Sequence, residues 1–388
     1  MRFMCRPMTD APQSPDPPKK PPLRRGWTTG ACATAATRAA FVALVSGGEP
    51  PDPVEIGLPG GTRVAFALAN FTRGPDYAEA GVVKDAGDDP DVTHGALIRA
   101  RLRRAPPGTG VAFAAGPGVG MVTRPGLPLP PGEPAINPVP RAMMRQTIEE
   151  AAAELGVTPD AAIEISVDRG EALARSTLNG RLGIVGGLSI LGTTGIVVPY
   201  SCSAWIDTIH RGVDVARACG LDHIAATTGS TSEEAVRKLY GLPEEALIEM
   251  GDFAGGLLKY LRHHTVPRVT IAGGFAKLTK LAQGRLDLHS GRSSVDLGDL
   301  AATARDLGAN EAVGAAIRNA NSALEALAIA HAAGLDLAAP IARRAFDAAA
   351  RALANRATEL EIIIVGRDGA VLARSGFRPA IRAEDRHE

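Results

Sequence analysis

The spacing of hydrophobic and polar positions changes near residue 181, and this change predicts two domains. Before it, short apolar runs between Gly, Pro and Asn turns predict strands, without strict alternation with helices. The predicted strands are 54–58, 62–69, 81–84, 96–103, 111–115 and 162–167. Apolar residues at helical spacing predict helices over 31–45 and 141–155. This mixture predicts a two-layer α+β domain over residues 23–180.

From Arg181 onward the predicted elements alternate between strand and helix. The four strands are 183–187, 223–227, 246–250 and 268–272, and the helices that follow them are 201–219, 232–240, 253–263 and 275–282. Successive strand–helix pairs need crossover connections, which produce a parallel sheet. We therefore expect a Rossmann-like parallel-sheet domain over 181–290, which makes the chain α/β overall.

The ends of the chain have a different character. Residues 297–353 predict an Ala-rich helical segment, and the run EIIIV at 361–365 predicts a late strand, followed by a turn at Asp368-Gly369. We expect the region 291–388 to return to the first domain and complete or cover its sheet. Residues 1–22 are rich in Pro and charge and lack the apolar run of a signal peptide, which predicts a disordered leader.

Composition narrows the class of function. Lys and Arg number 42, and so do Asp and Glu, so the overall charge gives no attraction to nucleic acid or an anionic membrane. The four scattered cysteines predict neither disulfides nor a metal site and suit a reducing cytoplasm. The uncharged stretch 182–206 contains five glycines, so we interpret it as buried strand and ligand loop, not as a membrane span.

Two hydroxyl-rich turns are candidates for holding a small ligand. Thr28, Thr29 and Gly30 begin the first helix, and a helix start exposes N–H groups that favour a carboxylate or phosphate. Thr228, Gly229 and Ser230 follow a predicted parallel strand, whose carboxyl end is where open sheets bind ligands. The alternative is that both turns are ordinary helix caps. The run GPGVG, with Gly118 and Gly120, is a weak motif by itself.

Five segments in this order resemble the CbiD family of cobalt-precorrin-5B C1-methyltransferases. They are RRGWTTGACATAATRAA (24–40), KDAGDDPDVT (84–93), GVGMVTRPGLPLPPGEPAINPVPRAM (118–143), GTTGIVVPYS (192–201) and GGFAKLTKLAQGRLDLHS (273–290). The resemblance implies an S-adenosylmethionine-dependent enzyme of the anaerobic route to vitamin B12. It implies methylation of C1 of cobalt-precorrin-5B, a small-molecule substrate, to give cobalt-precorrin-6A.

The resemblance also implies site residues. It makes Gly118, Gly120, Asn137, Arg141, Thr193, Thr194, Lys277 and His289 candidates for contacts with the substrate or cofactor, beside the two hydroxyl-rich turns. Within the acidic segment, Asp85, Asp88 or Asp89 could orient a ring nitrogen or act as a base, although a solvated surface turn is the alternative. We expect the polar turns of the two domains to converge on one shared crevice.

Some features leave alternatives open. The acidic-x-Gly-x-Gly start of Rossmann methyltransferases is missing, so the cofactor is implied by the family alone. The chain has no Gly-Lys-Ser/Thr phosphate loop, which disfavours a nucleotide-dependent enzyme. A non-catalytic tetrapyrrole carrier of the same pathway remains the alternative function. The sequence does not determine the oligomeric state, and a homo-oligomer is one of the open alternatives.

Overall fold

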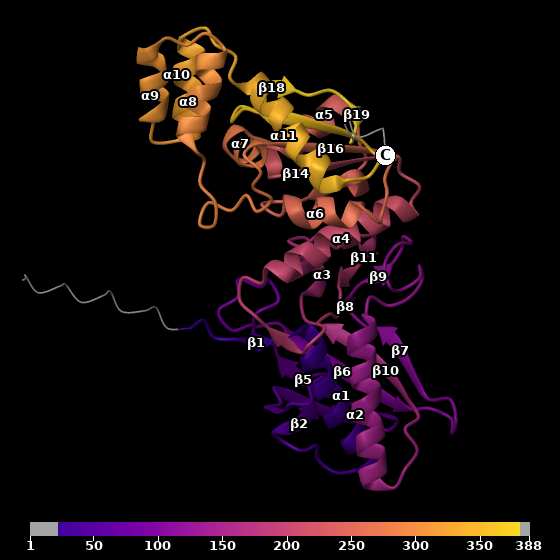
Figure 1. The fold of residues 1–388 in the computed structure, drawn as a ribbon. Coiled ribbons are helices and arrows are strands. Elements are labelled where there is room, and N and C mark those ends of the chain that lie inside the picture. Colours follow the sequence, from indigo (N-terminus) through magenta and orange to yellow (C-terminus); the bar gives the residue numbers. More distant parts are fainter. Residues whose placement is uncertain (1–21, 381–388) are drawn as a thin grey trace, which may run out of the picture.

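A computed structural model describes residues 22–380, which form two domains joined by short strand pairs (Figure 1). The predicted leader lies outside the described residues except for Pro22.

The first domain combines a mostly antiparallel sheet with helices, and the predicted two-layer arrangement stays a prediction. Its strand order is β4-β5-β6-β10-β7, and only the β10–β7 pair is parallel. These strands are β4 (Asn70–Arg73), β5 (Tyr77–Val83), β6 (Leu97–Arg104), β7 (Val111–Ala115) and β10 (Ala161–Val167). A separate hairpin comprises β2 (Val54–Gly57) and β3 (Arg63–Phe66). The edge strand β4 was not predicted, because none of its residues is buried and its sequence has no apolar alternation.

Helix α1 (Thr29–Ser46) is the centre of this domain. It packs against the sheet, against helix α2 (Pro138–Leu155) and against β2. Its small residues are buried on all sides, which is the pattern of a core helix. By length and composition alone α1 could span a membrane, but 78% of it is buried inside the protein.

Short strand pairs lie between the two domains. They are β1 (Gly26–Trp27) with β13 (Ile196–Val197), β8 (Gly118–Val119) with β12 (Gly187–Leu188), and β9 (Met121–Val122) with β11 (Ile184–Val185). The single strand predicted over 183–187 is therefore wrong. Gly186, at φ 87°, breaks it into β11 and β12, and neither joins the parallel sheet.

The second domain contains a sheet in the order β15-β14-β16-β17-β18. Strands β14 (His223–Thr227), β15 (Leu247–Glu249), β16 (Arg268–Gly274) and β17 (Glu359–Val365) pair in parallel, while β18 (Val371–Arg374) and β19 (Arg378–Pro379) are antiparallel to β17. The parallel pairing predicted for the strands at 223, 246 and 268 is confirmed. The description of this domain as Rossmann-like stays a prediction.

Helices cover both faces of the second sheet. Alternate residues of β14 and β17 pack with helices α4 (Cys202–Ala218), α6 (Ala254–Leu261), α7 (Phe275–Ala282) and α11 (Ala338–Leu353). The other face packs against α5 (Ser230–Tyr240). The predicted helical segment is confirmed, with α8 (Leu297–Asp306), α9 (Glu311–Arg318) and α10 (Ala323–Ala332) preceding α11 at one end of the molecule (Figure 1).

The late strand does not return to the first domain, so that expectation was wrong. Strand β17 pairs with β16 on one side and with β18 and β19 on the other. Its residues from Leu360 to Ile364 are fully buried. The apolar ones suit an inner strand covered by helices on both faces, and the Glu361 carboxylate pairs with Arg374.

Candidate functional site

A cavity of about 600 Å³ lies between the two domains, and we call it the interdomain cavity. Segments far apart in the sequence form its wall. They are the start of α1, the turn after β5, the start of α2, residues 176–191, one face of α4 and the end of β15. The charged side chains in its lining are Lys84, Asp91, Asp207, Arg211 and Glu249.

The start of α1 lies at this cavity, and the N–H groups of Gly30 and Ala31 have partners within the protein. The Thr28 hydroxyl accepts a hydrogen bond from the Ala31 N–H at 3.1 Å, and the Gly30 N–H donates to the Leu191 carbonyl at 3.0 Å. The Thr29 hydroxyl accepts from the Leu191 N–H at 2.9 Å. This helix start therefore anchors the segment around Leu191, as an ordinary helix cap would, while Thr28 and Thr29 line the cavity, and a role of this turn in binding a ligand anion stays a prediction.

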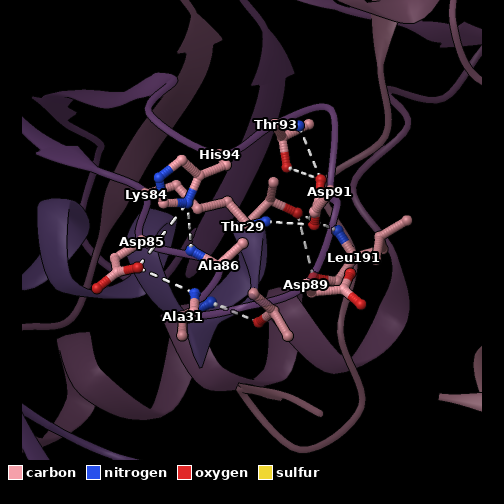
Figure 2. A network of polar contacts seen from close by, with 12 residues as sticks. Thr29, Ala31, Lys84, Asp85, Ala86, Asp89, Asp91, Thr93, His94 and Leu191 are labelled. Atoms are coloured by element: carbon pink, nitrogen blue, oxygen red, sulfur yellow. Dashed lines mark hydrogen bonds and ion pairs between the residues drawn. The ribbon is translucent and has the colours of Figure 1, made fainter. Parts of the chain in front are cut away.

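Lys84 and Asp91 form an ion pair in the cavity wall. The Lys84 side chain is 1% exposed and that of Asp91 is 25% exposed. Asp91 also accepts hydrogen bonds from the Thr93 N–H at 2.7 Å and the Thr93 hydroxyl at 2.6 Å (Figure 2). Burial raises the pKa of Asp91, but the Lys84 charge and the Thr93 hydrogen bonds outweigh burial, so the pKa is lowered overall. The turn thus presents a carboxylate that stays ionised.

The three carboxylates selected from the sequence do not line this cavity. Asp85 pairs with the Arg24 guanidinium, whose hydrogen bond lowers the pKa of Asp85 to about 2. Asp88 accepts from the Arg24 N–H at 2.6 Å, and Asp89 accepts from the Tyr200 N–H at 2.8 Å. These contacts tie neighbouring chain segments to the acidic turn. The fold directs Lys84 and Asp91 of this segment to the cavity, and the roles suggested for Asp85, Asp88 and Asp89 stay a prediction.

Helix α4 supplies the wall on the side of the second domain. Trp205, Thr208 and Arg211 recur every three residues, which places them on one helix face, and all three line the cavity. Arg211 has long contacts to Asp207 at 3.4 Å and Asp214 at 3.7 Å. Sequence reasoning missed this face, although its spacing within the predicted helix was a usable signal.

Of the other candidate site residues near the first domain, some line the interdomain cavity and others do not. Asn137 lines the cavity at the start of α2. Arg141 is directed elsewhere, because it donates to the Ile136 carbonyl at 2.7 Å and pairs with Glu133 at 2.9 Å. Thr193 and Thr194 are exposed and outside the lining.

Gly118 and Gly120 belong to the packing between strands and not to the cavity wall. An added Cβ on Gly118 would lie 2.1 Å from the Val167 carbonyl oxygen, and one on Gly120 would lie 2.5 Å from Ile184. These glycines let neighbouring backbones approach closely. The structure therefore gives a packing reason for a motif that resembles a cofactor loop.

A second cavity of about 340 Å³ lies at the carboxyl ends of β14, β16 and β17, and we call it the sheet-end cavity. Thr228, Gly229, Ser230 and Lys277 line it, as does Arg367. It shares no lining residue with the interdomain cavity. The expectation of one shared crevice was therefore wrong, since Thr28 and Thr228 line different cavities. His289 is exposed and lines neither.

Comparisons with known proteins agree across most of the chain. The family model described as CbiD matches residues 16–199, and the model described as CbiD, C-terminal domain, matches 287–376. Proteins named cobalt-precorrin-5B C(1)-methyltransferase are 60% identical in Methylorubrum extorquens (90% of this chain, 97% of the relative) and 60% identical in a Bradyrhizobium species (92% and 95%). A third, from Paramagnetospirillum magneticum, is 61% identical (90% and 97%). A crystal structure of cobalamin biosynthesis protein cbiD from Archaeoglobus fulgidus is 29% identical, with coverage of 70% and 83% and a TM-score of 0.38.

Proposed function

Since the chain belongs to the CbiD family, we propose that its interdomain cavity is where this methyltransferase of cobalamin biosynthesis methylates C1 of cobalt-precorrin-5B. The observation that carries the placement is that this cavity is lined by both domains and by the acidic segment that the family resemblance singled out. Ligand sites occur preferentially in such concave positions between domains.

We infer that S-adenosylmethionine is the methyl donor and that it binds in the same cavity. When bound, it supplies an electrophilic methyl group on a positively charged sulfur. The interdomain cavity is lined by the carboxylates of Asp91, Asp207 and Glu249, which attract a cation. The charged residues lining the sheet-end cavity are Lys277 and Arg367, which repel one. Charge therefore favours the interdomain cavity for the sulfonium.

The residues of the cavity have the task of alignment. Methyl transfer from a sulfonium needs donor and acceptor held in line and shielded from water, and it needs no nucleophilic side chain. The apolar part of the wall, which includes Leu127, Leu182 and Leu188, excludes water from the reacting atoms. Lys84 keeps the Asp91 carboxylate ionised and fixed.

Arg211 is the cation best able to receive a carboxylate of the macrocycle. Its side chain is 36% exposed and its own carboxylate partners lie at 3.4 and 3.7 Å, so it can turn toward a ligand without losing a close pair. The other lining cation, Lys84, is already buried against Asp91.

We also propose that the second domain is Rossmann-like. The order of its sheet, with β14 between β15 and β16, supports this description.

A mass measurement tests the activity against a carrier function. Purified protein is incubated with S-adenosylmethionine and cobalt-precorrin-5B, and the corrinoid is analysed by mass spectrometry. We expect a product heavier by one methyl group, located at C1 by NMR. A corrinoid that binds the protein and is recovered unmethylated would instead support the carrier.

Two matched substitutions test the location of the donor. Leu191 lines the interdomain cavity and Leu324 lines the sheet-end cavity, so replacing each by Trp fills one cavity at a time. We expect Leu191→Trp to lower kcat/KM by roughly tenfold or more, since misplacing the reactants by about 1 Å has effects of this size. Leu324→Trp should retain activity. If Leu324→Trp abolishes binding of S-adenosylhomocysteine, the donor site is the sheet-end cavity.

A further inference from the structure

Trp205 gives the interdomain cavity a flat aromatic surface. It lies in the first turns of α4, which begins at the Ser201 cap, where the Ser201 hydroxyl accepts from the Ala204 N–H. The side chain lines the cavity, and the residue is 43% exposed. An indole in this position offers a flat apolar face to a ligand in the cavity.

The indole is supported from within the protein and open toward the cavity. A Cβ placed on Gly251 would lie 3.5 Å from Nε1 and 3.6 Å from Cε2 of Trp205, so the ring lies beside this glycine. The Phe253 ring lies with its centroid 6.4 Å from that of Trp205. These neighbours restrict the movement of the indole while leaving part of its surface free.

The charge of the cavity wall makes this surface important for binding. Cobalt-precorrin-5B carries several carboxylates, yet the lining holds two cations, Lys84 and Arg211, beside three carboxylates. Lys84 is already paired with Asp91. Few side chains of the lining can therefore form ion pairs with the macrocycle, and contact with its conjugated ring gains weight beside hydrogen bonds from the hydroxyl and amide groups of the wall.

We propose that Trp205 is a binding residue on which the flat face of the corrinoid macrocycle stacks, and that it aligns the macrocycle for methyl transfer. The inference rests on the proposed function of the interdomain cavity. The apolar residues Val92, Leu191 and Val197 also line the cavity and exclude water from the ring. Aromatic stacking tolerates different substituents at the edge of a ring, which suits a macrocycle recognised by its face.

A matched pair of substitutions separates stacking from simple packing. Trp205→Phe keeps a flat ring, whereas Trp205→Leu keeps apolar volume without one. Trp27→Phe is the control, because Trp27 is the other tryptophan of the chain and packs against Phe66 at a centroid distance of 5.2 Å. Binding is measured by equilibrium dialysis with cobyrinic acid, a cobalt-corrin carboxylic acid followed by its visible absorbance. KM is measured separately for cobalt-precorrin-5B and for S-adenosylmethionine, and circular dichroism melting verifies folding.

We expect Trp205→Leu to weaken corrinoid binding by roughly tenfold or more and to raise KM for the corrinoid, as loss of an aromatic stack does. Trp205→Phe should stay within about threefold of the parent protein, and Trp27→Phe should match it. Equal binding by the Leu and Phe variants would overturn the proposal, as would a raised KM for S-adenosylmethionine alone, or no binding of cobyrinic acid by the parent protein. A parent protein that binds the corrinoid through Trp205 but transfers no methyl group would contradict the proposed function and leave this inference standing.

Discussion

Lys84 is buried against Asp91, and the same carboxylate also accepts two hydrogen bonds from Thr93 in the wall of the interdomain cavity. The pair is unequal, since the lysine is almost inaccessible while the carboxylate retains contact with solvent. Removing the carboxylate and removing the lysine should therefore have different effects on the stability of the fold.

The first prediction concerns this asymmetry. Asp91→Asn leaves a buried lysine without its counter-ion and should cost about 3–5 kcal/mol of unfolding free energy. Lys84→Met leaves a carboxylate that solvent can reach and should cost less. Urea unfolding measures both values, and the double variant should recover part of the loss from Asp91→Asn. A larger loss for Lys84→Met than for Asp91→Asn would contradict the structure.

The second prediction is the pH dependence of this stabilisation. The pKa of Asp91 is lower in the folded chain than its unfolded value of about 3.9. The unfolded chain therefore binds the proton more readily, so the stabilisation is complete above about pH 4 and is lost as pH falls through the folded pKa. The urea midpoint of Asp91→Asn should decrease less on acidification over this range than that of the parent protein. If the urea midpoints of the two proteins decrease equally on acidification, this contribution is excluded.

The third prediction separates the acidic residues by function. Asp85→Asn, Asp88→Asn and Asp89→Asn should each keep kcat within about threefold, because effects on catalysis require contact with the reacting groups or their positioning and these carboxylates lie outside the cavity lining. Asp91→Asn should lower kcat by roughly tenfold or more, as loss of a preorganised charge does. Steady-state methyl transfer measures all four, and a defect shared equally by all four variants would contradict the distinction.

The fourth prediction tests Arg211 as the anchor for a macrocycle carboxylate. Arg211→Gln should raise KM for the corrinoid by roughly tenfold, the size expected for losing a charge-assisted hydrogen bond. Arg217→Gln is the matched control on the same helix, because Arg217 donates to the Thr265 carbonyl at 3.1 Å and lies outside the cavity lining. The anchor role fails if the two variants have the same KM.

The fifth prediction concerns the glycine motif. Gly118 has φ 81° and no space for a Cβ, whereas Gly108 has φ 84° with nothing within 4 Å. Gly108→Ala should cost about 1–2 kcal/mol for the left-handed backbone alone. Gly118→Ala should cost about 1–3 kcal/mol more, because the added methyl group meets the Val167 backbone. Thermal and urea unfolding of the two variants compare these costs, and equal costs would mean that the strand pair adjusts freely.

Local patterns in the sequence were enough to locate most helices and strands. The helix at 275–282 and the strand at 223–227 have the predicted bounds, because their periodicity and flanking glycines are unambiguous. The prediction of one strand over 183–187 was wrong, since periodicity does not reveal that Gly186 has a positive φ and interrupts the strand. The partner of β17 was also unpredictable, because an apolar run specifies burial and leaves the neighbouring strand unspecified.

The site was harder to predict than the fold. The sequence identified the hydroxyl turn at Thr28 and the acidic segment after β5, but it could not say which side chains the turn directs inward. Lys84 and Asp91 become visible only when burial and pairing are known. The Thr228 turn was recognised by its local chemistry, yet its distance from the first domain depends on how the domains pack, which is a long-range property.

The place of β17 between β16 and β18 determines when the second sheet can be completed during synthesis. The first domain ends its sheet with β10, so it can fold while the ribosome is still translating the rest of the chain. Strand β16 pairs with β14, which precedes it, but its second partner, β17, emerges only after the four helices α8 to α11. Until then one edge of β16 is unpaired beside a nascent polypeptide, and an unpaired strand edge is a site where other chains can add.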